Sequence, residues 1–185
     1  GHWQDLVGTA EKKNDSAGLW IANTKQGTNL ESVSINLDAR EQSSGDLELT
    51  FLYEGQSNFG LVFRGDKQKT SQWQSFAYNR DGRWQLGQPG GKWLTNIPGP
   101  TLLSGQQYKL LVRYDGKKIQ TFLNDQLFYE NEEVHYPDGT SINDDWMGAV
   151  GIRLFGNLSK LNIISMKSGS VGSIPVIDSS AEYRD

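Results

Sequence analysis

The clearest structural signal in this chain is the stretch at residues 107–130, which reads QYKLLVRYDGKKIQTFLNDQLFYE. Apolar and polar residues alternate along 107–114, 117–123 and 126–130, as is typical of half-buried β-strands. The dipeptides Asp115-Gly116 and Asn124-Asp125 between these runs favour tight turns. The stretch therefore predicts a three-stranded antiparallel meander.

The same alternation continues on both sides of the meander, while helical periodicity is nearly absent. About twelve short strands are predicted, at residues 18–23, 32–38, 46–53, 58–64, 72–79, 83–87, 92–95, 107–114, 117–123, 126–130, 148–155 and 158–166. Turn-forming residues separate them at short intervals. A series of short strands without helices predicts an all-β fold, an antiparallel β-sandwich or jelly roll.

Length and composition limit the class of protein further. The 185 residues are enough for one domain, and no run of about 18 apolar residues suggests a transmembrane helix. Eighteen basic residues against 22 acidic ones give a net charge of −4, and the charges are interspersed, so nucleic acid is not an expected partner. The absence of cysteine excludes a disulfide framework, a thiolate zinc site and a cysteine nucleophile.

The regular pattern stops after Met166. We therefore expect residues 1–167 to form one β-sandwich module and residues 168–185, which begin with a Ser/Gly-rich stretch, to be a linker or tether toward a following domain. The lack of cysteine fits secreted or cell-wall-anchored proteins of Gram-positive bacteria. We expect an extracellular, monomeric module inside a multidomain chain, without a membrane partner.

Aromatic residues are the first candidates for a binding surface. Trp73, Trp84, Trp93 and Trp146 all have polar neighbours in the sequence, which suggests that they face water. A flat aromatic ring packs well against the C–H face of a sugar, while neighbouring polar groups reach its hydroxyls. The alternative is that most of these tryptophans fill the core of the sandwich.

Two arginines at strand ends are the second candidates. If Leu61 and Phe63 point into the core, Arg64 lies on the opposite face of its strand, and Arg153 does so by the same reasoning. A guanidinium has fixed donors that can hold two vicinal hydroxyls. Alternatively, either arginine pairs with Glu48 or another carboxylate on the sheet as part of the structure.

The longest irregular polar segment is residues 131–146, and long polar loops on rigid sandwiches often form binding sites. Its oxygen ligands include Asp138, Asn143, Asp144 and Asp145, yet their spacing matches no calcium-loop motif. We expect no cofactor, with a structural calcium ion left open and a solvated surface loop as the alternative.

Catalytic signatures are missing from the sequence. A glycosidase needs two carboxylates across a cleft, and the Glu-x-Asp-x-x-Glu strand signature of lectin-fold glucanases is absent. Neither Gly-x-Ser-x-Gly nor a phosphate-binding glycine loop occurs. We expect this chain to have no catalytic residues of its own.

Several motifs, taken in order, resemble those of the concanavalin A-like (lectin-fold) carbohydrate-binding modules, particularly the levan-binding modules of bacterial exo-levanases. The resemblance covers about residues 3–167 and rests on Trp3-x-x-x-x-Gly8, Asp46-Leu47-Glu48-Leu49, Gly60-Leu61-Val62-Phe63-Arg64, the meander and Val150-Gly151-Ile152-Arg153. It implies that Arg64 contacts a ligand and that Trp73 supplies the aromatic ring of the next strand. The chain departs from the levan-binding pattern at Tyr78, which stands where those modules tend to have a carboxylate, at Phe155, and in the longer loop 131–147. In overall style it also resembles the galactose- and N-acetyllactosamine-binding modules of streptococcal surface β-galactosidases.

Together these features predict a non-catalytic module that binds the terminal sugar of a glycan, of galactose, N-acetyllactosamine or fructan type. The parent is expected to be a secreted or surface glycoside hydrolase, such as a β-galactosidase. Trp73 and Trp146 are expected to stack on the sugar, Arg64 and Arg153 to donate hydrogen bonds, and Glu48, Gln74, Tyr78 and Asp144 to contact hydroxyls. The alternatives are a lectin-fold glycoside hydrolase and a laminin-G-like protein-binding adhesion module.

Overall fold

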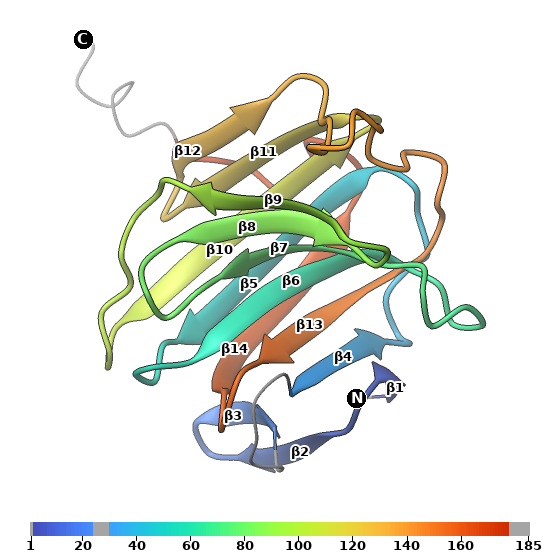
Figure 1. Ribbon diagram of the computed structural model, residues 1–185. Helices are drawn as coiled ribbons and strands as arrows, with labels where there is room; N and C mark the ends of the chain where they lie inside the picture. The colour runs from blue at the N-terminus through green and yellow to red at the C-terminus, as the bar shows by residue number, and fades with distance from the viewer. Residues whose placement is uncertain (1, 24–29, 178–185) are drawn as a thin grey trace, which may run out of the picture.

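The computed structural model describes residues 2–23 and 30–177, and in this part of the chain it contains strands and no helix. The strands form two seven-stranded antiparallel sheets packed face to face (Figure 1). The predicted all-β antiparallel sandwich is therefore confirmed. The strands are β1 (Trp3–Val7), β2 (Ala10–Asp15), β3 (Gly18–Asn23), β4 (Glu31–Asn36), β5 (Gly45–Leu52), β6 (Asn58–Gly65), β7 (Gln74–Tyr78), β8 (Trp84–Gln88), β9 (Lys92–Ile97), β10 (Gln107–Asp115), β11 (Lys118–Leu123), β12 (Gln126–Asn131), β13 (Ala149–Phe155) and β14 (Lys160–Gly169).

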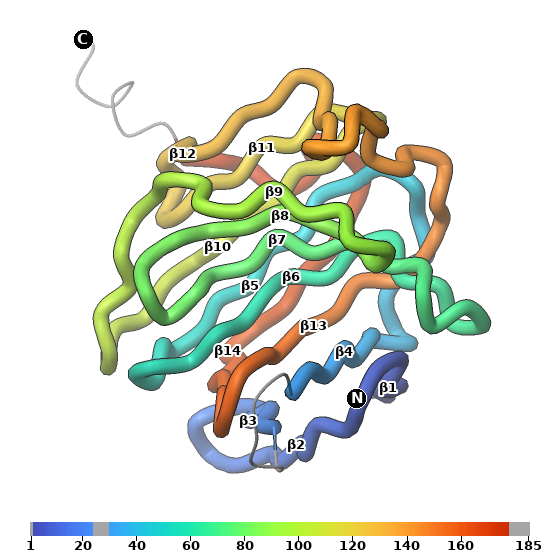
Figure 2. Tube along the Cα trace, viewed as in Figure 1, coloured from blue at the N-terminus to red at the C-terminus, as the bar shows by residue number. Residues whose placement is uncertain are grey.

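Each sheet combines a local meander with strands from distant parts of the chain. The first, sheet A, has the order β1-β4-β13-β6-β7-β8-β9, and the second, sheet B, has the order β12-β11-β10-β5-β14-β3-β2. The meander β10–β12 is present as predicted, with Asp115 paired to Lys118 at its first turn. In Figure 2 the traces of β7 and β8 cross in front of that of β10, and β11 and β12 lie above β9 in this view. The rings of Trp84 on β8 and Phe128 on β12 have centroids 4.8 Å apart.

Side chains of alternate residues from both sheets fill the space between them. Leu47, Leu49 and Phe51 of β5 point inward, as do Phe59 and Phe63 of β6, and all are fully buried. Phe51 and Phe59 meet across the sandwich with ring centroids 4.9 Å apart. The core is thus made by the period-two pattern from which the strands were predicted.

Two strands near the N-terminus were not predicted. β1 and β2 lie at the edges of sheets A and B, and β2 carries the polar run Glu11-Lys12-Lys13-Asn14-Asp15. Edge strands commonly carry charged residues, which discourage pairing with other chains, so their apolar alternation is weak. Pattern alone therefore misses them.

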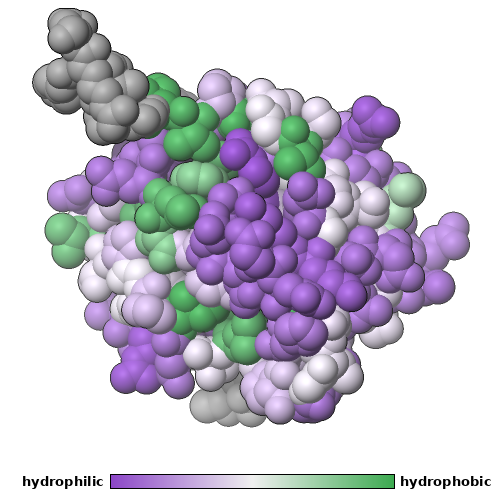
Figure 3. All heavy atoms as spheres, turned by 90° about the horizontal axis from the view of Figure 1, so that it is seen from above, coloured by the Kyte–Doolittle hydropathy of each residue, from purple (hydrophilic) through white to green (hydrophobic). Residues whose placement is uncertain are grey.

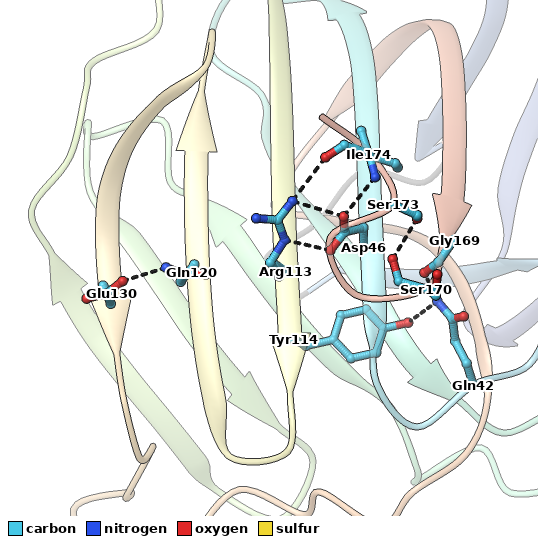
Figure 4. A network of polar contacts seen from close by, with 10 residues as sticks. All are labelled: Gln42, Asp46, Arg113, Tyr114, Gln120, Glu130, Gly169, Ser170, Ser173 and Ile174. Atoms are coloured by element: carbon cyan, nitrogen blue, oxygen red, sulfur yellow. Dashed lines mark hydrogen bonds and ion pairs between the residues drawn. The ribbon is translucent and has the colours of Figure 1, made fainter. Parts of the chain in front are cut away.

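The C-terminal part of the described chain is ordered beyond the expected boundary at residue 167. β14 continues to Gly169, and residues 170–177 then lie against the outer face of sheet B, where Ile174 packs with Leu111 and Phe122. Figure 4 shows the polar contacts that hold this segment, in which the Asp46 carboxylate accepts from Arg113 at 2.8 and 3.1 Å and from the Ile174 amide at 3.1 Å. We call residues 170–177 the strap. That residues 168–185 connect to another domain stays a prediction, and residues 178–185 lie outside the described part.

Half of the outer face of sheet A is also covered. Val33, Ile35 and Val62 point away from sheet B yet are fully buried, together with Leu6 and Trp73. The covering loop at residues 66–72 is tied to β1 because the Gln4 side chain donates to the Lys67 carbonyl at 2.8 Å. Every residue of β6, β7 and β8 is buried as well, so the middle strands of this face leave little room for a ligand.

The surface shows no large apolar face in the view from above (Figure 3), where hydrophobic residues form several separate patches on a mainly hydrophilic surface. Exposed apolar side chains such as Leu103, Leu127 and Met147 come from different elements. Among residues 2–23 and 30–177 there is no helix that could cross a membrane.

Candidate functional site

Arg64 lies inside the sandwich and not on its outer face, so the orientation expected from alternation is wrong. Phe63 and Arg64 together oppose Val150, because Ala149 pairs with Gly65 and Gly151 with Val62. In this β-bulge Arg64 has a left-handed backbone, with φ of 54°, and its side chain turns toward sheet B. The guanidinium carbon lies 5.2 Å from the centre of the Tyr114 ring, and the residue has no solvent exposure.

The Arg64 guanidinium is held by three uncharged acceptors. Its Nε donates to the Ser43 carbonyl at 2.7 Å, Nη1 to the Gln74 side-chain oxygen at 2.9 Å and Nη2 to the Gly116 carbonyl at 2.8 Å. Burial lowers the pKa of Arg64 to about 10, and the carboxylate of Asp144 partly offsets that effect. Arg64 thus remains charged at neutral pH.

Gln74 connects Arg64 to the long loop. Its side-chain nitrogen donates to the Asn143 carbonyl at 2.8 Å, and Gln88 donates to the Asn143 side chain at 2.8 Å. The Tyr136 hydroxyl donates to Gln88 at 3.2 Å. This buried network fixes the loop at residues 131–147 against the end of the sandwich, and it gives Arg64 and Gln74 a structural role that their sequence pattern did not indicate.

The expected exposure of Trp73 and Trp84 is also wrong. Trp84 is fully buried in the core, where it packs on Tyr78 at 4.8 Å, and its indole nitrogen donates to the Pro100 carbonyl at 3.0 Å. Trp73 is 2% exposed and donates to the Thr70 carbonyl at 3.1 Å. The polar neighbours of these two tryptophans in the sequence do not indicate that the indoles are exposed. These neighbours point to the other face of each strand or lie in the covering loop.

The other expected contact residues are spread over the molecule. Tyr78 lies in the core and accepts a hydrogen bond from the Leu102 amide at 3.0 Å. Glu48 is on the outer face of sheet B, next to Leu111 and Lys167. Asp144 and Trp146 are partly exposed in the long loop. A binding role for these residues, and for Arg64 and Gln74, stays a prediction.

The structure gives no support for calcium in the loop. Within the described ranges, no group of three or more His, Asp or Glu side chains is placed to hold a metal ion. The Asp138 carboxylate is instead engaged by the Lys92 ammonium and the Thr140 hydroxyl, which hold its pKa well below the usual range. The sequence left a structural calcium ion open, and that possibility stays untested.

Arg153 and Trp73 do come together, and with them a set of residues that the sequence analysis did not assign to the site. The Arg153 guanidinium carbon lies 4.1 Å from the centre of the Phe155 ring, 4.6 Å from that of Trp93 and 5.8 Å from that of Trp73. These distances are within the range of cation–π attraction. We call Arg153, Glu31, Ser75, Trp93 and Phe155 the Arg153 site.

Glu31 is the charge partner of Arg153. Arg153 Nε donates to Glu31 Oε2 at 2.7 Å, and Nη1 lies 3.5 Å from the Ser75 hydroxyl, the outer limit of a hydrogen bond. Burial lowers the pKa of Arg153, and the neighbouring Glu31 carboxylate raises it in part. Among the described residues, neither Arg153 Nη2 nor Glu31 Oε1 has a hydrogen-bond partner.

A glycine of the neighbouring strand is paired with each of Arg153 and Trp93. Arg153 is on β13 and Trp93 on β9, with β6, β7 and β8 between them in the sheet. Gly60 is the β6 residue paired with Arg153, and Gly87 is the β8 residue paired with Trp93. A Cβ on Gly87 would collide with the Trp93 ring, so the indole packs directly on the backbone of β8.

The Arg153 site opens to solvent at an open hollow of about 390 Å³, lined by Leu30, Glu31, Arg153, Phe155 and Gly156. A second hollow of about 530 Å³ is lined by Trp3 and Lys12 among other residues, but none of them is an arginine that could supply a forked donor. The first hollow therefore has the better set of groups: an aromatic ring, a forked donor and a carboxylate acceptor. These are the groups that bind a sugar ring and its hydroxyls.

Part of the Arg153 site was detectable from the sequence. Phe155 stands two residues after Arg153 and must share its face of the strand. Glu31 begins β4, which pairs with β13 only in the folded chain, and Glu31 there lies opposite Phe155. Trp93 was noted as a polar-flanked tryptophan, but nothing in the sequence places it beside Arg153.

The fold is that of lectin-like β-sandwiches, which include carbohydrate-binding modules. The structure is similar to the carbohydrate-binding module CBM66 from Bacillus subtilis, with a TM-score of 0.66, 14% identity and coverage of 91% of this chain and 95% of that one. It is also similar to a Bacillus subtilis protein with a galectin-like fold, with a TM-score of 0.63, 13% identity and coverage of 91% of this chain and 90% of that one. A third similar structure is the Ca2+/Man-bound exoplasmic/lumenal domain of VIP36, with a TM-score of 0.62, 13% identity and coverage of 95% of this chain and 86% of that one. At these identities the likeness shows the fold.

The sequence itself has a near-identical relative. It is 99% identical over all 185 residues to part of a protein described as hyaluronate lyase HylB, from Enterococcus faecalis strain ATCC 700802 / V583. The chain spans 18% of the length of that protein. No known family profile matches the chain.

Proposed function

We propose that this chain is a non-catalytic glycan-binding module that holds a sugar ring at the Arg153 site. The observation that carries the proposal is the arrangement of Arg153 against Phe155 and Trp93, with Glu31 beside it, at an open hollow by the start of β4 and the end of β13. The lectin-like fold supports this function, because several of its structural neighbours are described as carbohydrate-binding or mannose-bound proteins.

Each group of the site has a distinct part in binding. The partly exposed Phe155 ring lines the hollow and offers an apolar surface to the C–H face of the sugar, while Trp93 on β9 packs on the Arg153 guanidinium and holds it in position. Arg153 Nη2 donates to ring hydroxyls and Glu31 Oε1 accepts from them. One or two sugar units bury little area, so we expect a dissociation constant of roughly 10 μM to 1 mM.

The parent protein is proposed from the near-identical relative. Because that protein is described as a hyaluronate lyase, we propose a polysaccharide lyase as the parent, in place of the glycoside hydrolase expected from the sequence. A polysaccharide substrate is met outside the cell, so the module is proposed to be extracellular, secreted or held at the cell wall. Binding would keep the enzyme near its substrate, and several contacts at once would compensate for weak single sites.

Binding of the isolated chain to a glycan panel tests the proposal. The panel contains galactose-, N-acetyllactosamine- and fructose-terminated probes, N-acetylhexosamine oligomers and hyaluronate fragments. We expect binding to at least one probe, and a loss of about tenfold in affinity for Trp93→Ala, since the contact of its ring with the Arg153 guanidinium contributes on the order of 1–2 kcal/mol.

Trp20→Ala is the matched control, because Trp20 is a partly buried tryptophan on β3 of the other sheet. Both variants should retain the wild-type circular dichroism spectrum, and Trp20→Ala should bind as the wild type does. Equal loss in both variants, or no binding to any probe, would contradict the proposal. Turnover of a probe would instead support a lectin-fold hydrolase, and binding to protein alone a laminin-G-like adhesion module.

A further inference from the structure

The charge balance of the Arg153 site indicates which sugars it accepts. Among the described residues that line the hollow, Arg153 is the only cation and Glu31 the only anion. The two are paired, with Arg153 Nε 2.7 Å from Glu31 Oε2. The pair has no net charge, and the Arg153 side chain is 8% exposed whereas that of Glu31 is 30% exposed. A ligand therefore meets the carboxylate more fully than the guanidinium.

The hydrogen-bonding capacity of Glu31 also favours a neutral sugar over an acidic one. Glu31 Oε1 has no partner among the described residues and can only accept hydrogen bonds when ionised. A sugar hydroxyl can donate to it, but the carboxylate of a uronic acid offers only acceptors and carries the same charge. Like charges a few ångströms apart in a partly buried site repel by more than they would in water.

We propose that Glu31 is a specificity-determining residue that makes the Arg153 site select neutral sugars over uronic acids and other acidic sugars. The inference rests on the proposed function and adds the class of ligand to it. In a polymer such as hyaluronate, which alternates an N-acetylhexosamine with a uronic acid, the site would hold the neutral hexosamine.

Among the residues that the structure describes, Arg80 is another cation close to Gly156, but it does not reverse this balance. Its guanidinium lies beside Gly156, where a Cβ would stand 2.8 Å from it, and donates to the Asn157 carbonyl at 3.3 Å and the Ser159 hydroxyl at 3.4 Å. It is on the side of Gly156 that faces Asn58, and not among the residues that line the hollow. The charge that a bound sugar meets first is that of Glu31.

Matched pairs of probes test the inference without any variant. Hyaluronate hexasaccharide is compared with its carboxyl-reduced form, in which each uronic acid has become a neutral hexose, and glucose-terminated with glucuronate-terminated probes. We expect the neutral member to bind about five- to tenfold more tightly, with little dependence on salt. Equal or tighter binding of the acidic member would overturn the inference while leaving the proposed function intact. No binding of either member of any pair would count against the proposed function itself.

Glu31→Gln tests the residue. Glutamine keeps an acceptor for Arg153 Nε but removes the negative charge, so the preference for the neutral member should shrink by about fivefold or more, chiefly through tighter binding of the acidic one. Glu130→Gln, on β12 of the other sheet, is the control for the same change in net charge and should leave the preference unaltered. An unchanged preference in Glu31→Gln would overturn the role of Glu31, and thermal unfolding of both variants would establish that they are folded.

Discussion

Arg64 and Arg153 have the same local sequence pattern but opposite positions. Each follows inward-facing apolar residues on a central strand of sheet A, and each was expected on the outer face. Arg153 lies on the outer face because β13 pairs regularly with β4 at that point, so successive side chains alternate between the two faces. Arg64 does not, because a bulge inserts one residue and gives it a φ of 54°. A bulge depends on the pairing partner, which a single strand does not reveal.

Substitution of Arg64 by Met should therefore destabilise the fold. The variant would leave the Ser43 and Gly116 carbonyls and the Gln74 side chain without their donor. Buried unpaired acceptors cost about 1–3 kcal/mol each, and removal of the buried charge offsets part of this, so we expect the free energy of unfolding to fall by about 2–4 kcal/mol. Urea denaturation measures the loss. Wild-type stability combined with lost glycan binding would show that Arg64 is a ligand contact after all.

The buried tyrosines predict a loss of stability in alkali. Burial, with a smaller contribution from the neighbouring Tyr78, raises the pKa of Tyr53 to about 12. In the unfolded chain a tyrosine titrates near pH 10, so between about pH 10 and 12 the unfolded state releases this proton while the folded state keeps it. The stabilisation is complete below pH 10 and is lost as the pH rises through 12. Over that window Tyr53 lowers the free energy of unfolding by up to about 1.4 kcal/mol per pH unit.

Tyr53→Phe isolates that contribution. The variant loses the hydrogen bond from the Tyr53 hydroxyl to the Ser57 carbonyl, 2.9 Å long, and should be less stable by about 1 kcal/mol at pH 8. Between pH 10 and 12, however, its stability should decline less steeply than that of the wild type. Urea unfolding at several pH values gives both slopes, and parallel slopes would show that Tyr53 has no raised pKa.

At the scale of elements, the sequence predicted the strands whose two faces differ most. The meander β10–β12 was found because inward Tyr108, Leu110 and Val112 alternate with more polar residues and because each turn has a strong signal. β1 and β2 were missed because edge strands lack that contrast. The predicted end of the last strand was early for the same reason, since β14 becomes polar after Met166 although its pairing with β5 continues to Gly169.

The contact between β8 and β9 can be tested through Gly87. A methyl group on this residue would occupy the position of the Trp93 ring, so Gly87→Ala should push the indole away from Arg153. We expect glycan affinity to fall by about five- to tenfold, with a loss of stability of about 1–2 kcal/mol from overpacking. Isothermal titration with the best-binding probe and urea unfolding measure the two effects.

Thr95→Ala serves as the control for Gly87→Ala, because Thr95 is an exposed residue on the same strand as Trp93. It should bind the probe as the wild type does. Full affinity in Gly87→Ala would mean that the contact of Trp93 with Arg153 is not needed for binding.

At the scale of the whole molecule, the class of fold was predictable and the assembly of the site was not. Short alternating strands define a sandwich wherever each strand is placed, because each must bury one face. The Arg153 site instead depends on the order of strands in sheet A, which brings Glu31 of β4, Arg153 of β13 and Trp93 of β9 to one face from positions far apart in the chain. Such long-range pairing leaves no mark in local patterns, and so Glu31 was not a candidate.

The proposed binding site and the strap lie on different layers of the sandwich. The Arg153 site is on the outer face of sheet A and the strap on that of sheet B, so the two lie on opposite faces of the sandwich. A chain that ends at Gly169 should therefore lose stability without losing affinity. Removal of Ile174 exposes Leu111 and Phe122 and takes the Ile174 amide from Asp46, which should lower the free energy of unfolding by about 2–3 kcal/mol. Glycan affinity, measured at a temperature where both forms are folded, should stay within about twofold, since distant sites with no shared contacts act independently. A large fall in affinity on truncation would mean that the two sheets are coupled and that the strap helps to form the binding surface.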